Sequence, residues 1–191
     1  MFAGERQRKI AEMMENSSSV KVVERAAEMV EDGYSVILDT GTTTLEMAKR
    51  IRNKKITVIM NALDIAEGLS GVDNIELIMT GGALIGNTRA MVGYLTENML
   101  KNFRADIAFI DANGITLKDG ATTPNHVEAM TKRAIISSSH KVYVVSDASK
   151  SGKISFAVIS PVLKVTGIIT AGESNDEMKA IEEKNEIEII R

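Results

Sequence analysis

The chain of 191 residues contains no cysteine, only two prolines and only two histidines. The lack of cysteine excludes disulfides, thiolate catalysis and metal sites built on cysteine. The histidines, His126 and His140, show no spacing with carboxylates that suggests a metal site, so we expect no metal and no cofactor. No apolar run approaches the roughly 18 residues of a membrane span, so we expect no membrane partner.

Basic residues are not in excess, because 23 lysines and arginines face 26 acidic residues, for a net charge of −3. This balance argues against a broadly basic nucleic-acid-binding surface, although it leaves room for a local patch. The start of the chain, Met1–Lys9, lacks the apolar core of a signal peptide. We therefore expect a soluble protein of the cytoplasm.

Hydrophobic residues make up 44% of the chain, enough for a substantial core, and its length fits one large domain or one domain with a small extension. Short apolar runs alternate with helical patterns. The runs expected to be strands are Tyr34–Leu38, Ile56–Met60, Ile75–Met79, Ile107–Ile110, Val142–Val145, Thr166–Ile169 and Ile187–Ile190. Most are continuously apolar, as expected where both faces of a sheet are covered.

Helical periodicity marks the segments between the strands. We expect helices over residues 20–31, 45–51, 91–103, 126–138 and 175–184. In residues 91–103 the expected buried stripe consists of Val92, Leu95, Met99 and Phe103. The alternation of strands and helices predicts the α/β class, with a mostly parallel sheet and helices on both of its faces.

The most informative segment is Asp39-Thr-Gly-Thr-Thr-Thr44, which joins a predicted strand to a predicted helix. Gly41 permits close approach of a ligand to the backbone, and the hydroxyls of Thr42, Thr43 and Thr44 are able to donate to phosphate oxygens. The helix macrodipole favours an anion at this position. Three consecutive threonines exceed what a helix cap needs, so we interpret the segment as a phosphate-binding turn. It is not a Walker loop, because that glycine spacing is absent.

Two further polar groups follow the next two predicted strands. Asn61 either caps the following helix or offers its amide to the same ligand. Gly81 and Gly82 permit tight approach at a strand end. Arg89 lies beyond them and either reaches an anion with two parallel donors or is an incidental surface residue of a flexible loop.

The second half of the chain adds charged side chains. Asp111 ends a predicted strand, and Lys150 follows another, where it contacts a ligand or points to solvent. Glu128 and Lys132 are four residues apart, which is the spacing of an ordinary surface ion pair or of an acid and a cation that face one site. All these groups follow strands whose carboxyl ends meet at one edge, as a site for a small polar ligand requires.

Several motifs occur in a fixed order from about Val20 onward. They include Ala26-Ala-Glu-Met-Val-Glu-Asp-Gly33, Leu38-Asp-Thr-Gly-Thr-Thr-Thr44, Thr57-Val-Ile-Met-Asn-Ala62, Asn74-Ile-Glu-Leu-Ile-Met-Thr-Gly-Gly82, Glu128-Ala-Met-Thr-Lys-Arg133 and Asp147-Ala-Ser-Lys150. In this set and order, the chain resembles the effector-sensing domain of DeoR-family transcriptional regulators.

The resemblance implies a Rossmann-like fold shared with ribose-5-phosphate isomerases. It also implies a phosphorylated sugar or sugar-catabolic intermediate as effector, and assembly into a homo-oligomer, either a dimer or a tetramer. The positions that match the family's ligand-binding motifs are Asp39, Gly41, Thr42, Thr43, Asn61, Gly81, Gly82, Arg89, Asp111, Glu128, Lys132 and Lys150.

The start of the chain departs from the family pattern. Residues 4–15 resemble either the opening helix of a winged helix-turn-helix or the linker helix after it, and residues 16–19 are expected to cap the next helix. The rest of a winged domain has no room before Val20, so we expect DNA contact only through a winged helix-turn-helix missing from this chain. We therefore expect a helical appendage over residues 1–19 and an effector-binding and oligomerisation domain over residues 20–191.

These observations predict a sensor rather than an enzyme. It would belong to a regulator of sugar metabolism, specifically a repressor, in which effector binding shifts a population of conformations. One alternative is an aldose–ketose phosphate isomerase, with Glu128 as the base and Lys132 or Lys150 steadying the enediolate. The other is an oligomerisation partner without a DNA reader, which joins full-length relatives in mixed assemblies.

Overall fold

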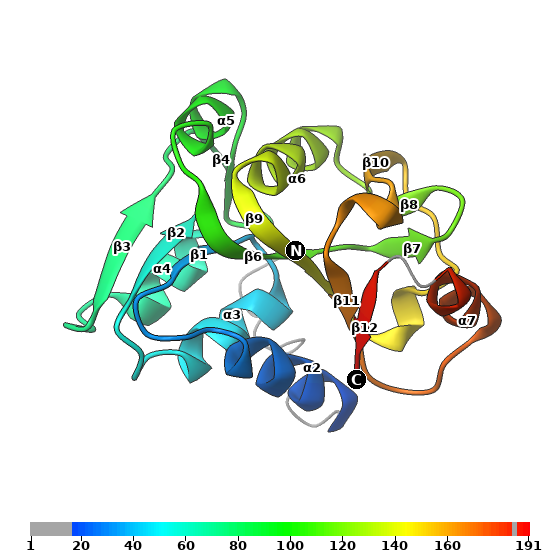
Figure 1. Ribbon diagram of the computed structural model, residues 1–191. Helices are drawn as coiled ribbons and strands as arrows, with labels where there is room; N and C mark the ends of the chain where they lie inside the picture. The colour runs from blue at the N-terminus through cyan, green and yellow to red at the C-terminus, as the bar shows by residue number, and fades with distance from the viewer. Residues whose placement is uncertain (1–16, 185–186) are drawn as a thin grey trace.

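The computed structural model describes residues 17–184 and 187–191, so the predicted helix within residues 5–15 lies outside the described residues. Seven strands form one sheet in the order β12-β11-β9-β6-β1-β2-β3 (Figure 1). Their bounds are β1 Ser35–Leu38, β2 Ile56–Met60, β3 Ile75–Met79, β6 Ala105–Asp111, β9 Ser139–Val145, β11 Gly167–Ile169 and β12 Glu188–Ile190. Every pairing in this sheet is parallel, which confirms the predicted parallel arrangement.

Helices cover both faces of the sheet, as predicted. Their bounds are α2 Ser17–Glu28, α3 Thr42–Arg50, α4 Leu63–Leu69, α5 Tyr94–Leu100, α6 His126–Ser137 and α7 Asp176–Glu183, with short 3-10 turns η1 at Ala148–Lys150 and η2 at Val162–Lys164. Side chains alternate along β1, so that Leu38 packs with α2, α3 and α4, whereas Ile37 belongs to the cluster that includes α5, α6 and α7 residues. The sheet therefore separates two hydrophobic layers.

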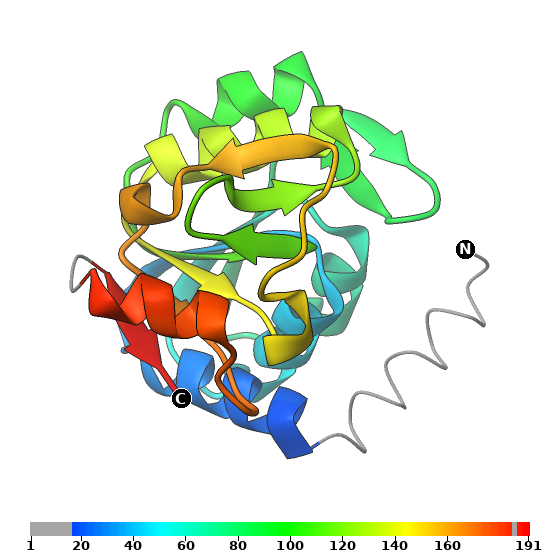
Figure 2. The same ribbon diagram turned by 90° about the vertical axis from the view of Figure 1, so that its right-hand side faces the viewer.

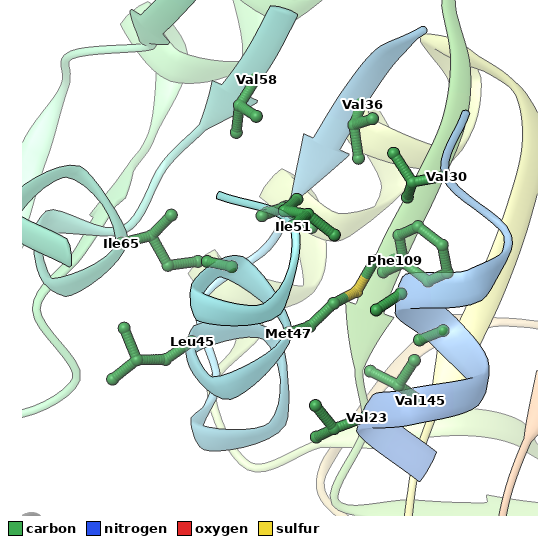
Figure 3. Packing of buried hydrophobic residues seen from close by; sticks show 14 of the residues in the cluster. Val23, Val30, Val36, Leu45, Met47, Ile51, Val58, Ile65, Phe109 and Val145 are labelled. Atoms are coloured by element: carbon green, nitrogen blue, oxygen red, sulfur yellow. The ribbon is translucent and has the colours of Figure 1, made fainter. Parts of the chain in front are cut away.

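The layer under α2 and α3 is built around Phe109 of β6. Figure 3 shows Val30, which follows α2, and Met47 of α3 beside this ring, and all three side chains are buried. The ring also stacks on Tyr143 of β9, with ring centroids 6.1 Å apart. Packing on this face holds α3, and with it the predicted phosphate-binding turn, against the centre of the sheet.

The order of the strands creates a switch point between β1 and β6. The chain moves from β1 through β2 to β3 on one side, then returns to β6 on the other side of β1 and continues outward to β12. In open parallel sheets, ligands bind at the carboxyl ends of the strands where the order reverses. The end of β1 and the end of β6 are therefore the places to look for a site.

Two small antiparallel sheets were not predicted. One is a hairpin of β4 (Ala83–Ile85) and β5 (Ala90–Val92), and the other contains β7 (Gly114–Thr116), β8 (Gly120–Thr123) and β10 (Ala157–Ser160), which lie together beside α6 in Figure 2. These strands have three or four residues each and are rich in small side chains. Runs this short carry little periodicity, which is why the sequence did not reveal them.

The predicted helix over residues 91–103 is wrong at its start. Val92 belongs to β5, and helix α5 begins only after Gly93, whose φ of 90° is incompatible with a continuous helix. Because the expected apolar stripe combined two different elements, Leu95 is not in the core and instead has 67% of its surface exposed. In the described part of the chain, no helix is long and apolar enough to cross a bilayer.

The turn after β3 gives a first test of this fold. Gly82 has φ 113°, and a Cβ added there would lie 2.1 Å from Oγ1 of Thr96 and 2.7 Å from the carbonyl oxygen of Val92. We expect Gly82→Ala to lower the free energy of unfolding by about 2–4 kcal/mol through backbone strain and overpacking. Urea unfolding followed by circular dichroism measures this change.

The matched control is Gly86→Ala, in the loop of the same hairpin, where an added Cβ would meet no atom within 4 Å. We expect this variant to unfold within about 0.5 kcal/mol of the unsubstituted chain. Equal stabilities of the two alanine variants would contradict the described packing of the hairpin base.

Candidate functional site

Two carboxylates lie side by side at the switch point. Asp39 is the residue after β1, and its backbone N–H donates to the carbonyl of Phe109 at 3.1 Å. Oδ2 of Asp39 accepts a hydrogen bond from the backbone N–H of Asp111, the last residue of β6, at 3.3 Å. Asp39 is only 1% exposed. Asp39 is therefore held inside the protein with Asp111 half-buried beside it, and each needs a compensating partner.

Lys132 supplies the compensating cation. Its ammonium forms a buried ion pair with Oδ2 of Asp39, although the two residues are far apart in sequence. Asn125 sets the start of α6, because its side chain accepts hydrogen bonds from the backbone N–H groups of Val127 and Glu128 at 2.9 and 3.4 Å. This cap fixes the rotation of the helix that directs Lys132 toward the end of β1.

Glu128 and Lys132 do not form the ordinary surface ion pair that their spacing allowed. Both are buried, at 8% and 3% exposure. The carboxylate of Glu128 instead accepts a hydrogen bond from the hydroxyl of Thr88 at 2.9 Å, while Lys132 is paired with Asp39. The ordinary surface ion pair is therefore wrong, and the alternative in which both side chains face one site stays a prediction.

Burial and mutual attraction shift the pKa values of this cluster. Burial raises the pKa of Asp111 from 3.8 to about 6, even though the nearby Lys132 acts to lower it. Burial alone would lower the pKa of Lys132, but the charges of Asp39 and Asp111 outweigh it and hold that pKa above its ordinary value. Lys132 therefore stays charged at neutral pH, whereas Asp111 gains or loses its proton at a pH of about 6.

The threonine turn divides into structural and available hydroxyls. Oγ1 of Thr44 donates to the backbone carbonyl of Asp39 at 2.7 Å and lies 3.1 Å from that of Gly41, so this predicted ligand residue fastens the turn internally. The hydroxyls of Thr42 and Thr43 have no hydrogen-bond partner among the described residues, and no side chain caps α3. Gly41 lies close to Asp111, because a Cβ added to Gly41 would lie 3.0 Å from Cβ of Asp111.

Lys150 lies on the far side of Asp111 from β1. The end of β9 leads into η1, where the side chain of Asp147 accepts a hydrogen bond from the backbone N–H of Ser149 at 2.9 Å. Lys150 is half-buried, and its charge acts to lower the pKa of Asp111, which places it in the same electrostatic environment. Within residues 17–184 and 187–191 its ammonium has no hydrogen-bond or ion-pair partner.

Asn61 follows β2 and contacts the hairpin rather than capping α4. Its backbone carbonyl accepts from the N–H of Met91 at 2.7 Å, and its side-chain Nδ2 donates to the carbonyl of Met91 at 3.3 Å. Ala62 occupies the N-cap position of α4, and no described side chain caps this helix. Of the two predicted roles of Asn61, the cap is therefore wrong, and its amide oxygen is left for another partner.

The loop that contains Gly81, Gly82 and Arg89 makes its contacts away from the carboxylates at the switch point. Gly81 and Gly82 lie at the base of the hairpin, where the Gly81 carbonyl accepts from the hydroxyl of Thr96 at 2.6 Å. Arg89 forms ion pairs with Asp64 and Glu67 of α4. The guanidinium of Arg89 thus anchors the hairpin to α4 and is not brought to the carboxylates at the switch point.

Thr88 and Thr40 are site residues that sequence reasoning missed. The hydroxyl of Thr40 donates to the carbonyl of Thr88 at 3.2 Å, and the hydroxyl of Thr88 donates to Glu128 at 2.9 Å. Thr88 therefore joins the hairpin both to the turn after β1 and to α6. No signal in the sequence marks it, since it is one small polar residue in a glycine-containing loop.

A hollow at the surface lies away from the predicted site. A surface hollow of about 510 Å³ lies between α2 and the end of the chain, lined by residues that include Lys21, Arg25, Gly172 and Arg191, and none of the predicted ligand residues lines it. Two of its charged groups, Arg25 and Glu28, form an ion pair with each other. Because none of the predicted ligand residues lines this hollow, the switch point remains the candidate site.

Comparison with known sequences identifies relatives. A model of the family described as "DeoR C terminal sensor domain" matches residues 15–172. The HTH-type transcriptional regulator GlpR of Haloferax volcanii is 32% identical over 164 residues, which cover 83% of this chain and 64% of that protein. The putative aga operon transcriptional repressor of Escherichia coli O157:H7 is 33% identical, over 78% of this chain and 55% of that protein. The chain thus spans less than two thirds of either relative.

Comparison with solved structures supports the fold. Ribose 5-phosphate isomerase A from Methanocaldococcus jannaschii aligns with a TM-score of 0.51 and 17% identity, over 70% of this chain and 53% of that one. The delta subunit of eIF2B from Chaetomium thermophilum aligns with a TM-score of 0.59 and 15% identity, over 79% of this chain and 54% of that one. The predicted Rossmann-like fold, similar to that of ribose-5-phosphate isomerases, is confirmed.

The buried ion pair predicts a large effect of removing the cation. We expect Lys132→Met to lower the free energy of unfolding by about 3–5 kcal/mol, because Asp39 is left charged and uncompensated in the interior. Adding Asp39→Asn to that variant should restore part of the loss, which urea unfolding of both proteins measures. Lys141→Met, at an exposed lysine of β9, is the control. The assignment fails if Lys132→Met is no less stable than this control.

The raised pKa of Asp111 predicts a dependence of stability on pH. Its value of about 6 in the folded protein exceeds the ordinary 3.8, so the folded chain binds more protons between these values. The associated stability is complete below about pH 4 and is lost as pH rises through about 6. We expect Asp111→Asn to be more stable than the unsubstituted chain at pH 7, by on the order of 1–3 kcal/mol, with little difference at pH 4.

Urea unfolding between pH 4 and pH 7.5 measures this difference. Asp106→Asn is a control of opposite sign, because the hydrogen bond from the hydroxyl of Ser35 lowers the pKa of Asp106. That variant should lose stability relative to the unsubstituted chain above about pH 4. A difference for Asp111→Asn that stays constant with pH would contradict the burial of an ionisable acid at this position.

Proposed function

Because the chain belongs to the family of DeoR C-terminal sensor domains, we propose that it binds a phosphorylated sugar or a related intermediate at the carboxyl ends of β1, β2 and β6. Binding there alters the conformations available to the domain, and through them the activity of a transcriptional regulator. The proposal makes the domain a sensor and not an enzyme.

The observation that carries the proposal is the state of the first turn of α3. The half-buried hydroxyls of Thr42 and Thr43 have no partner among the described residues, and no side chain satisfies the backbone N–H groups of this turn. Uncapped N–H groups, free hydroxyls and the helix dipole together favour an anion. A phosphate group at this turn would satisfy donors that are otherwise left without an acceptor.

Charge around the turn supports the same assignment. Lys150 is half-buried without a partner in the described chain and lies near Asp111, at the same edge of the sheet as Thr42. An ammonium held in this way is suited to a doubly charged phosphate, whereas Lys132 is already occupied by Asp39. We therefore assign the phosphate to the hydroxyls of Thr42 and Thr43 and to the ammonium of Lys150.

The names of the relatives support a role in transcriptional regulation. The matched proteins include an aga operon repressor and regulators named GlpR, GolR and IolR. We propose that this chain likewise serves a repressor of sugar metabolism and assembles into a homo-oligomer. Since the chain spans 64% of GlpR and 55% of the aga repressor, contact with DNA belongs to the proposal and not to the residues described above.

The test replaces both available hydroxyls at the turn. We expect the Thr42→Val, Thr43→Val double variant to bind phosphorylated sugars at least about tenfold more weakly, because hydrogen bonds to a charged group contribute about 1.5–3 kcal/mol each. Calorimetry with a panel of phosphorylated and unphosphorylated sugars measures the affinity. Thr57→Val, at the start of β2, is the control and should bind as the unsubstituted chain does.

Two results would overturn the proposal. If no phosphorylated sugar in the panel binds, or if the double valine variant binds as tightly as the Thr57→Val control, the phosphate assignment is wrong. If NMR of the same mixtures shows conversion of ribose 5-phosphate, and Glu128→Gln abolishes it, the chain is an aldose–ketose isomerase. The buried Glu128, held near the switch point by Thr88, is the residue that keeps this second function testable.

A further inference from the structure

Two oxygen atoms at neighbouring strand ends have no hydrogen-bond partner in the described part of the chain. They are Oδ1 of Asp39 and Oδ1 of Asn61, and less than 1 Å² of each is exposed to solvent. The residues that carry them are 1% and 2% exposed. Buried polar atoms are normally hydrogen-bonded, and an unsatisfied one costs about 1–3 kcal/mol. Two such atoms in one place therefore require an explanation.

Strand register places both oxygens on the same side of the sheet. In the parallel pairing of β1 and β2, Ile37 lies opposite Ile59, and both pack in the cluster that includes α6 residues. Alternation of side chains puts the residues two positions further on, Asp39 and Asn61, toward that same side. The contact of Lys132 of α6 with Asp39 agrees with this direction.

The hydrogen bonds of the neighbouring atoms show that each unsatisfied atom is an acceptor oxygen. Oδ2 of Asp39 already accepts from Lys132 and from the backbone of Asp111, so Oδ1 is the free acceptor. The Nδ2 group of Asn61 donates to the carbonyl of Met91, so its Oδ1 is the remaining atom of the amide. Turning the amide over would set two oxygens against each other. Both free atoms are therefore acceptors that need a donor.

The β4–β5 hairpin covers these acceptors. Met91 of β5 is bonded to Asn61 through both its N–H and its carbonyl, and Thr88 joins the hairpin to Thr40 and Glu128. The hairpin is flanked by Gly81 and Gly82 before it and by Gly93 after it, all with positive φ. A ligand reaches the acceptors only after this cover moves.

We propose that Oδ1 of Asp39 and Oδ1 of Asn61 accept hydrogen bonds from two hydroxyl groups of a polyol ligand, which enters when the β4–β5 hairpin lifts. This inference rests on the proposed function for the position of the phosphate, and it adds the chemistry of the other half of the ligand. The free hydroxyls in the first turn of α3 take the anion, whereas the free acceptors lie on the α6 side and take hydroxyls. A carbon chain with several hydroxyls and one terminal phosphate fits this division.

The binding test uses ligands that differ in their hydroxyl groups. Glycerol 3-phosphate and propyl phosphate share the same carbon chain and phosphate but differ by two hydroxyls, and ribose 5-phosphate extends the series. We expect the hydroxylated compounds to bind at least about tenfold more tightly than propyl phosphate, as two hydrogen bonds would provide. In Asn61→Leu, which keeps the branched shape of the side chain but has no acceptor, this ratio should fall several-fold while the affinity for propyl phosphate stays unchanged.

Thr170→Val is the matched control for that variant. Oγ1 of Thr170 is also buried without a hydrogen-bond partner, but it follows β11, on the far side of β9 from the site. Its replacement likewise removes one unsatisfied oxygen at nearly constant volume. We expect Thr170→Val to keep the full ratio between hydroxylated compounds and propyl phosphate. Urea unfolding of both variants confirms that they are folded.

Movement of the hairpin is measured with a single fluorescent label. Because the chain has no cysteine, Leu84→Cys on β4 provides a unique attachment point, and Leu84 is 50% exposed. Leu163→Cys, at a residue of η2 that is 41% exposed, is the control position. We expect ribose 5-phosphate to change the emission of the label at residue 84 and not at residue 163.

The outcomes separate this inference from the proposed function. If propyl phosphate binds as tightly as the hydroxylated compounds, or if Asn61→Leu keeps the full ratio, the acceptor pair is wrong while the phosphate site stands. If ribose binds as tightly as ribose 5-phosphate and depends on Asn61, the acceptor pair stands and the phosphate assignment is wrong. Absence of binding by every compound overturns both, and binding without a change at residue 84 overturns the movement of the hairpin.

Discussion

The buried contact between the ammonium of Lys132 and the carboxylate of Asp39 is the interaction on which the site depends. It ties α6 to the end of the central strand β1, and it neutralises one of the two acids that the switch point brings together. A buried ion pair adds little net stability, because desolvation of both charges offsets their attraction. Its effect is positional: Glu128, one turn earlier on α6, is held at the same edge.

The same contact explains why the two halves of the edge differ in chemistry. With Lys132 occupied, the cation still available near the switch point is Lys150, on the side of β6 and β9. On the opposite side, Asp39 and Asn61 retain oxygens without donors. A ligand with an anion at one end and hydroxyls at the other therefore has one favourable orientation. Specificity then arises from groups that only the correct orientation satisfies.

The sequence was sufficient for the parallel sheet and for the turn after β1, because continuous apolar runs and a strand-to-helix loop are strong local signals. The sequence did not predict the environment of a side chain where the same pattern fits two different structures. The spacing of Glu128 and Lys132 fits any helix face, and only tertiary packing shows that both are buried. Arg89 was placed in the site for its charge, yet Asp64 and Glu67 of α4, close to it in space, take its guanidinium.

The hairpin over the edge was the least predictable element, and it is the one on which sensing would turn. Its strands are too short to show a period, and the link from Thr88 to Glu128 joins residues that lie far apart in sequence. A ligand shifts a conformational equilibrium only as far as its affinity differs between the two states. Acceptors that are unsatisfied under the closed hairpin supply such a difference, since a bound hydroxyl stabilises the open state and has no counterpart in the closed one. The unsatisfied acceptors of the ligand-free site would thus provide the free-energy difference by which a ligand shifts the conformation of the domain.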